Sequence, residues 1–226
     1  GRVSHPDFRV RFDGWDAPSG DAVLLDHGWW QPVATPQLIS GDPADTGGFP
    51  WGDVVVGGTG DVTGDGVPDV VVNSGQFTPR YYVLAGLGDG TLGAPQFFTV
   101  PSAVYDLALA DLNGDGLLDF LGGTGSQQVH VRLGIAGGDF APAETLTFDG
   151  AGSISDLLCI DLNGDSFVDI AAPDLVGVVL TRLGNGDGTF AEPRSFWAGG
   201  FVSSVALGDF DGDGCLDAFT PNRSTD

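Results

Sequence analysis

Asp111-Leu-Asn-Gly-Asp115-Gly-Leu-Leu-Asp119 is a nine-residue acidic sequence that occurs in four versions along this chain. The other versions begin at residues 61, 161 and 209, so that successive copies are 50, 50 and 48 residues apart. A near-constant period in this range marks repeat architectures, in which each period is one supersecondary unit. The residues between the copies then indicate which repeat fold the chain adopts.

Short runs of apolar, β-branched and aromatic residues surround the acidic copies. Tyr105–Leu109 and Ser155–Cys159 precede two of them, and Val70–Val72, Tyr81–Leu84 and Phe97–Val100 follow the first. Such runs, bounded by Gly, Asn, Asp and Pro, predict strands, and no helical period of useful length accompanies them. Each period therefore predicts about four antiparallel strands, the content of one propeller blade. We predict an all-β fold, a four-bladed β-propeller of four-stranded antiparallel blades.

The predicted organisation is a single domain over residues 1–226. Residues 51–226 carry four repeats, residues 38–50 predict a surface loop, and residues 1–37 hold strands that complete the terminal blade and enter the first. The basis is that Phe8–Pro18 can be aligned with Val129–Gly138, whereas about one strand follows the last acidic copy. Closure by both termini would remove exposed sheet edges. If the same strands complete a neighbouring molecule's blade, the subunits link head to tail into a fibre.

The acidic copies predict metal-binding loops, because three or four carboxylates within nine residues repel one another and need a cation. Oxygen donors at alternate positions suit Ca²⁺. Side chains at positions 1, 3, 5 and 9 and the carbonyl at position 7 would bind the ion, while glycine at position 6 allows a sharp turn. The predicted ligands, for up to four Ca²⁺ ions, are Asp61, Thr63, Asp65, Val67 and Asp69; Asp111, Asn113, Asp115, Leu117 and Asp119; Asp161, Asn163, Asp165, Phe167 and Asp169; and Asp209, Asp211, Asp213, Cys215 and Asp217.

The four loops differ in ways that predict different affinities. The fourth has four carboxylates and should bind calcium most tightly. The first has Thr63 at position 3, a shorter neutral donor, and the third has Ser166 where glycine is expected, so both should be weaker. Turns decorated with solvated acids are the alternative, which would be favoured for one copy but not for four at fixed spacing. Calcium of this kind is expected to be structural, so that a chelator lowers the melting temperature.

The charge of the chain is consistent with this interpretation. The formal net charge is −23, and 13 of the 31 acidic residues lie in the four loops. The eight basic residues are all Arg, and the acidity argues against nucleic-acid binding, because phosphate contact requires clustered Lys and Arg. No run approaches the roughly 18 apolar residues of a membrane span, and no signal peptide is present, so we expect no membrane insertion and a processed or excised piece of a longer product. Millimolar external calcium points to an extracellular location.

Two further features are local. Gly86–Leu92 and Gly184–Phe190 contain Asp-Gly pairs that predict tight turns between the third and fourth strands, with the carboxylates of Asp89 and Asp187 solvated. Cys159 and Cys215 do not occupy equivalent repeat positions. They can form a disulfide outside the cell or serve as two small buried side chains.

The acidic loops, the Gly-Asp-Gly-Thr turns and the Gly93–Pro95 and Ala191–Pro193 segments together resemble the FG-GAP/VCBS repeat family. Members of this family are calcium-binding β-propeller repeats, also present in integrin α-chains and in secreted propeller lectins. The resemblance covers residues from about 50 to 219. It implies calcium binding and an extracellular or cell-surface location. Complete rings in the family usually have seven repeats, whereas four are visible here.

Three classes of function can be compared. Catalysis is not expected, because His5, His27 and His130 are scattered and no catalytic motif occurs. Asp106 and Asp156 can pair as carboxylates across blades, but such repeat-equivalent positions are more often structural.

A structural or adhesive role, including head-to-tail assembly into a fibre or surface layer, fits a calcium-rigidified, Gly-rich chain. The Asn222–Ser224 sequon leaves room for glycosylation. Carbohydrate binding is the alternative, because Trp29, Trp30 and Trp51 lie outside the clear repeats and can stack on sugars. The favoured interpretation of those rings is that they fill the wedges between blades. We therefore predict an extracellular structural or adhesive module, with a propeller lectin as the second candidate.

Overall fold

The structure is a computed structural model that describes residues 57–73, 79–149 and 152–223. All regular elements in these residues are β-strands, and every strand pairing is antiparallel. The strands form three four-stranded sheets and a smaller fourth unit. The predicted all-β class and four-stranded antiparallel units are therefore confirmed.

The first sheet contains β1 (Gly57–Gly60), β2 (Asp69–Asn73), β3 (Arg80–Leu84) and β4 (Gln96–Thr99). The second contains β5 (Val104–Ala110), β6 (Asp119–Thr124), β7 (Gln128–Arg132) and β10 (Glu144–Thr147), and a small ribbon, β8 (Gly134–Ile135) with β9 (Asp139–Phe140), connects its last two strands. The third contains β11 (Leu158–Ile160), β12 (Asp169–Pro173), β13 (Val178–Arg182) and β14 (Arg194–Trp197). In each sheet the strands pair in chain order.

The fourth unit is a long hairpin interrupted by an irregularity. Its strands are β15 (Phe201–Val202), which pairs with β18 (Asn222–Arg223), and β16 (Ala206–Gly208), which pairs with β17 (Asp217–Phe219). Two paired strands are described here, where each of the other units has four.

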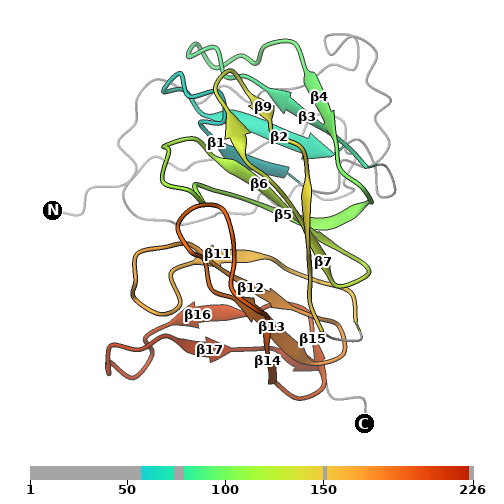
Figure 1. The fold of residues 1–226 in the computed structure, drawn as a ribbon, viewed down its shortest axis with the longest axis vertical. Helices are drawn as coiled ribbons and strands as arrows, with labels where there is room; N and C mark the ends of the chain where they lie inside the picture. Colours follow the sequence, from blue (N-terminus) through green and yellow to red (C-terminus); the bar gives the residue numbers. More distant parts are fainter. Residues whose placement is uncertain (1–56, 74–78, 150–151, 224–226) are drawn as a thin grey trace, which may run out of the picture.

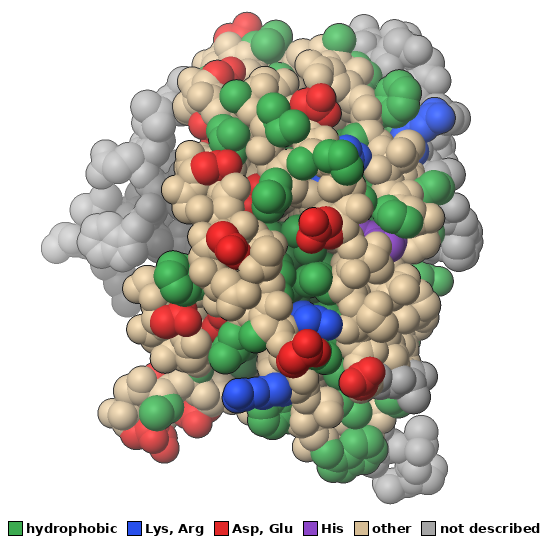
Figure 2. Space-filling view, viewed as in Figure 1, with side chains coloured by type: hydrophobic (Ala, Val, Ile, Leu, Met, Phe, Trp, Pro, Cys, Tyr) green, Lys and Arg blue, Asp and Glu red, His purple; other side chains and the backbone are tan. Residues whose placement is uncertain are grey.

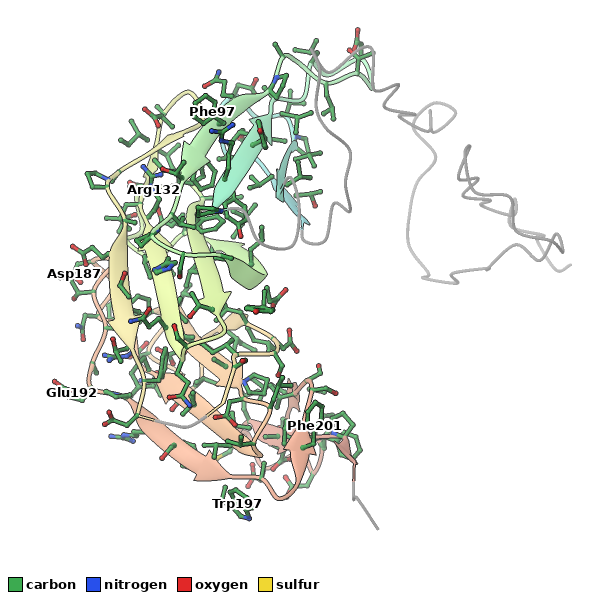
Figure 3. The ribbon with its side chains drawn as sticks, turned by 90° about the vertical axis from the view of Figure 1, so that its right-hand side faces the viewer. Phe97, Arg132, Asp187, Glu192, Trp197 and Phe201 are labelled. Carbon is green, nitrogen blue, oxygen red and sulfur yellow. The ribbon has the colours of Figure 1, made fainter. Side chains whose placement is uncertain are left out.

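The units follow one another along an arc. Figure 1 shows the first sheet at the top and the fourth unit at the bottom, and the turned view of Figure 3 shows that their succession is curved. The first strands of neighbouring sheets lie together on the concave side, where β5 contacts both β1 and β11. The fourth strands β4, β10 and β14 lie on the convex side.

The first strand of each later unit carries one more residue than the strand it pairs with. Pairing in the second sheet shifts between Val104 and Asp106. The same one-residue shift separates the bridge at Ile154 from the pairing of Leu158, and the pairing of Val202 from that of Ala206. A bulge of this kind leaves a residue outside the ladder and redirects its side chain.

The core lies between neighbouring sheets rather than within one. An aromatic cluster of Tyr81, Phe98, Phe120 and Phe140 joins the first sheet to the second, with ring centroids 4.6–6.2 Å apart. A second cluster, which includes Leu121, Phe148 and Ile170, joins the second sheet to the third. Because each sheet buries both faces, its middle strands are almost wholly apolar, as in β6 and β12, which are buried throughout.

Two arginines at equivalent repeat positions connect each sheet to the one before it. Arg132 on β7 donates to the carbonyl of Thr99 at 2.8 Å, at the end of β4 in the first sheet, and its guanidinium lies over the ring of Phe98. Arg182 on β13 repeats this contact with the carbonyl of Thr147 at 2.6 Å and the ring of Phe148. Figure 3 places Arg132 beside the first sheet. A planar cation with several donors suits this position, because it satisfies strand-end carbonyls while it covers an aromatic face.

The expected strands of residues 1–37, the surface loop 38–50 and the closure of the terminal blade lie outside the described residues. None of the residues that the structure describes forms an apolar helix of membrane-spanning length.

Candidate metal centre

Each acidic loop joins the first strand of a unit to the second. The loops run from β1 to β2, from β5 to β6, from β11 to β12 and from β16 to β17, so all four occupy the same position in their units. The loop between β16 and β17 projects at the lower left of Figure 1, and Figure 2 shows acidic side chains gathered at its tip. The repeat thus places four equivalent acidic loops along one molecule.

The aspartate at position 1 organises each loop. Asp111 accepts hydrogen bonds from the backbone N–H of Gly114 at 2.8 Å and of Gly116 at 2.9 Å. Asp61, Asp161 and Asp209 accept equivalent bonds in their own loops. In the third loop these N–H donors, led by that of Ser166, hold the pKa of Asp161 below its usual value. The charged carboxylate therefore stabilises the turn itself, before any cation is considered.

Positions 3 and 5 face each other in the second and third loops. Asn113 donates its amide Nδ2 to Asp115 Oδ2 at 2.9 Å, and Asn163 does the same to Asp165 at 2.8 Å. The other oxygen of each aspartate accepts the N–H two residues further on, which is the geometry of an Asx turn. Positions 3 and 5 therefore lie close together in these two loops.

The aspartate at position 9 is buried in the first three loops, in contrast to the exposed position 5, whereas Asp217 in the fourth loop is half-buried. Asp119 has no exposed surface, and its two oxygens accept the N–H of Leu112 and of Gly134, each at 2.7 Å. Asp69 and Asp169 accept the corresponding pairs of N–H groups. Burial raises the pKa of Asp119, while the two N–H donors oppose that rise. Position 9 therefore ties the acidic loop to the turn that follows the third strand.

That tie requires glycine on the turn. A Cβ at Gly134 would lie 2.5 Å from the carbonyl oxygen of Leu118, and one at Gly184 would lie 2.2 Å from that of Val168. Contacts this short do not occur for real Cβ atoms, so only glycine lets the turn approach the strand closely enough to donate its N–H to the buried aspartate. Sequence reasoning assigned position 9 to the metal and did not identify this second role.

Position 6 has the left-handed backbone in all four loops. Gly66, Gly116 and Gly214 have φ values of 87°, 86° and 88°, and Ser166 has φ 72°. Ser166 therefore adopts the glycine conformation, so the third turn keeps the shape of the others. A non-glycine residue in this region carries a conformational cost of about 1–2 kcal/mol.

The oxygens present fit a hard divalent cation. Ligand atoms of Asp209, Asp211 and Asp217 all lie within 4.8 Å of one another. In the first loop, Thr63 Oγ1 is buried and has no hydrogen-bond partner among the described residues, at the position where a ligand is expected. Ca²⁺ takes six to eight oxygen ligands, and carboxylate, amide, hydroxyl and backbone oxygens all qualify.

The sequence matches the FG-GAP-like repeat over residues 61–122, 111–172 and 174–220, which together cover well over half of the chain and include all four acidic loops. The chain belongs to the FG-GAP-like repeat family. A search of curated protein sequences found no match.

Two solved structures are similar to parts of this chain. A lectin from Agrocybe aegerita that recognises non-reducing terminal N-acetylglucosamine has a TM-score of 0.58 and 24% identity, over 78% of this chain and 49% of the lectin chain. The V. cholerae biofilm matrix protein Bap1 has a TM-score of 0.47 and 19% identity, over 74% of this chain and 28% of Bap1. This chain therefore spans about half the length of the lectin, and the likeness shows a propeller-like fold.

The Asp-Gly turns of the FG-GAP-like repeats are turns, as predicted. Bridges join Gly86 to Leu92 and Gly184 to Phe190. Asp187 is fully exposed, and its pKa is lowered chiefly by the hydroxyl of Thr189, which donates to Oδ1, and then by the Thr189 N–H. Asp89 makes the same contacts with Thr91. These carboxylates hold the turn and are not shared with the acidic loops.

Other sequence predictions have separate outcomes. Trp29, Trp30 and Trp51 lie outside the described residues. Cys159 and Cys215 are both free; Cys159 is partly buried and Cys215 is exposed in the fourth acidic loop, so the pair of buried side chains is not found. Burial raises the pKa of the Cys159 thiol to about 12. His130 is buried between the hydroxyls of Ser102 and Thr145, at 2.7 and 3.0 Å, with a pKa lowered by burial.

Proposed function

We propose that this chain is an extracellular, calcium-stabilised β-propeller module with a structural or adhesive role. The observation that carries the proposal is the acidic loop, which occurs four times at the same junction between first and second strands. A single acidic turn is weak evidence for a metal. Four equivalent turns whose oxygens are held by the fold are much stronger evidence, because the arrangement is costly without a cation.

The ligands in each loop would be the side chains at positions 1, 3, 5 and 9 with the carbonyl at position 7. A bound calcium ion supplies positive charge that offsets the repulsion among these carboxylates. The chain's own contribution is to hold the oxygens in place: position 1 caps the loop N–H groups, and position 9 connects the loop to the third-strand turn. Calcium would then fasten the first two strands of every unit to the rest of its sheet.

Calcium loops of moderate affinity fill at millimolar calcium, so the proposal places the module outside the cell or at its surface. Since the sequence contains no catalytic motif, we propose that the module has no chemistry of its own.

The test is a calcium titration of the whole chain by isothermal calorimetry, with thermal melts in calcium and in EDTA. We expect saturable binding and a melting temperature that falls by many degrees in the chelator. Asp213→Asn should weaken binding in the fourth loop, whereas Asp187→Asn, an exposed acid on a turn, is the matched control and should not. A melt that EDTA leaves unchanged would refute the calcium proposal.

We further propose that the fold is a four-bladed propeller whose fourth blade takes strands from residues 1–37. Exposed aromatic side chains in the third and fourth units support this. Phe98 is buried between the first and second sheets, whereas Phe196, at the equivalent position on β14, is 56% exposed. Phe219 on β17 is 65% exposed, although the equivalent Leu121 is fully buried. A completed fourth blade would cover both phenylalanines.

The strands could be donated within one molecule or between molecules, and the second case gives the head-to-tail fibre. Donation within the molecule is favoured at ordinary concentrations because the effective concentration of a tethered segment is about millimolar. Light scattering and negative-stain microscopy at millimolar calcium distinguish the two cases. Deletion of residues 1–20 should destabilise the fold if those strands complete the blade, and unchanged stability would contradict the proposal.

Carbohydrate binding is the second candidate, and an exposed aromatic on the convex side favours it. Trp197 on β14 is 74% exposed, and Figure 3 shows it and Glu192 pointing away from the sheets. Glu192 and Arg194 line a depression at the start of the same strand. Aromatic faces stack on sugars while charged groups bind hydroxyls. The similar Agrocybe aegerita protein is a lectin.

A glycan array tests this candidate. Loss of binding in Trp197→Ala would locate the site on β14, and loss in Trp30→Ala would locate it in residues outside the described part. An array without hits at millimolar calcium would remove the candidate.

A further inference from the structure

The extra residue of the first strands brings three polar side chains to equivalent places in consecutive units. Asp106, Asp156 and Ser204 are separated by 50 and 48 residues, the same intervals as the acidic loops. All three lie in the segments where the pairing register shifts by one residue. Since β5 and β11 are neighbours on the concave side, residues at these positions face each other across the boundaries between units.

The three side chains form a continuous hydrogen-bonded chain. Ser204 Oγ donates to Asp156 Oδ2 at 2.7 Å, and the N–H of Leu157 donates to Asp156 Oδ1 at 3.0 Å. The carboxyl of Asp106 interacts with that of Asp156 both by a side-chain hydrogen bond and by charge repulsion. The contact thus crosses from the second unit to the third and from the third to the fourth.

A hydrogen bond between two carboxyl groups requires a proton on one of them. Asp156 accepts the Ser204 hydroxyl on one oxygen and the Leu157 N–H on the other. Asp106 is partly buried, and this burial, followed by repulsion from Asp156, raises the pKa of Asp106 to about 6. Asp106 is therefore the member of the pair that carries a proton below about pH 6.

The charged groups around the pair are few. Among the described residues, Asp156 is the side chain whose charge raises the pKa of Asp106, and no arginine contributes to that pKa. Strand β1, on the other side of β5, has no titratable side chain between Gly57 and Gly60. On β11, the Cys159 thiol is near Asp106 but stays neutral, since burial and the charge of Asp106 raise its pKa to about 12. On the fourth unit the neighbour is Ser204, which does not titrate.

We propose that Asp106, Asp156 and Ser204 form a proton-dependent latch that holds three consecutive units together along the concave side. With a proton on Asp106 the two carboxyl groups attract through a hydrogen bond. Without it they repel each other across the boundary between the second and third units. The latch is distinct from the calcium loops, since none of its members is a loop residue. It makes contacts between units strongest in mild acid and weaker as the pH rises through about 6.

The direction of the effect follows from linkage. In the unfolded chain Asp106 has the ordinary pKa of 3.8, so the folded state binds the proton more tightly. The stabilisation is complete below that value and is lost as the pH rises through about 6. Asp106→Asn keeps the size of the side chain and cannot ionise, so it should lack this dependence.

The experiment is urea unfolding of the whole chain and of Asp106→Asn, in EDTA, at about pH 5 and about pH 7.5. Relative to the variant, the unfolding equilibrium constant of the unmodified chain should rise about three- to tenfold between the two pH values, the upper figure corresponding to the full shift without screening by solvent. Asp89→Asn, an exposed carboxylate on a turn, is the matched control and should show no such change.

If the ratio of the unfolding equilibrium constants of the unmodified chain and of Asp106→Asn is the same at both pH values, the latch proposal is wrong. A carboxyl carbon NMR titration of the unmodified chain provides a second measurement, which needs no variant to fold. Asp106 titrating near 6 supports the proposal, and Asp106 titrating near the ordinary value would overturn it. Because these measurements are made in EDTA, their failure leaves the calcium proposal unaffected, and the converse also holds.

Discussion

Replacing the buried aspartate of the second loop tests whether position 9 has a structural role apart from calcium. Asp119→Asn keeps the volume of the side chain but puts an NH₂ group where a carboxylate oxygen accepts an N–H. One of the two 2.7 Å bonds, to Leu112 or to Gly134, must then be lost. The variant therefore leaves two donors facing each other in a fully buried place.

The magnitude follows from those two hydrogen bonds. A hydrogen bond to a charged group contributes about 1.5–3 kcal/mol, and an unsatisfied buried donor costs about 1–3 kcal/mol. Because the carboxylate itself is costly to bury, part of this loss is recovered when the charge is removed. We expect Asp119→Asn to reduce the free energy of unfolding by about 2–3 kcal/mol, and Asp119→Ala, which loses both acceptors, by about 3–4 kcal/mol.

The assay is urea unfolding followed by circular dichroism, in EDTA, so that calcium does not contribute. Asp187→Asn is the matched control, because that aspartate is fully exposed and its hydrogen bonds are confined to its own turn. Its stability should stay close to that of the unmodified chain. If Asp119→Asn in EDTA is no less stable than Asp187→Asn, then the hydrogen bonds of Leu112 and Gly134 to Asp119 do not stabilise the fold, and position 9 serves calcium alone.

Three more predictions concern single residues. Ser166→Gly should stabilise the chain by about 1 kcal/mol, because glycine adopts the observed φ of 72° without strain; a lower melting temperature would count against this reasoning. Arg132→Ala should lower the free energy of unfolding, measured in urea, by about 2–3 kcal/mol, because the bonds to strand-end carbonyls are lost. Arg132→Lys should recover little of that loss, and full recovery in the lysine variant would mean that charge alone matters. Burial lowers the pKa of His130 below 6.5, so its neutral form contributes stability that is present above that pH and is lost as the pH falls below it; denaturation curves of the unmodified chain and of His130→Gln should therefore diverge below about pH 6.5, and parallel curves would refute the effect.

Much of the fold could be predicted from local sequence. The β-branched and aromatic runs at Val70–Val72 and Tyr81–Leu84 form strands, and the Asp-Gly turns form turns, because both signals act within a few residues. The position of the acidic loops between first and second strands also follows from the order of these signals.

The features that were missed depend on contacts distant in sequence. Asp119 meets the N–H of Gly134, fifteen residues later, and nothing near Asp119 indicates that its carboxylate is buried. The available signal for this contact was a glycine at the same position in three repeats, namely Gly86, Gly134 and Gly184. Likewise Arg132 and Arg182 interrupt apolar strands at equivalent positions, which would have indicated a contact between units. The sequence allowed Asp106 and Asp156 to pair across blades, because they occupy equivalent places five residues before their acidic loops.

The most direct test of the account is an anomalous-difference map from crystals of this chain grown with calcium, collected at a wavelength where calcium scatters anomalously. We predict peaks at the acidic loops, each about 2.3–2.6 Å from the oxygens of positions 1, 5 and 9, with the strongest peak at Asp209 and Asp217. Loops that keep the hydrogen bonds described above but show no peak in saturating calcium would contradict the central claim.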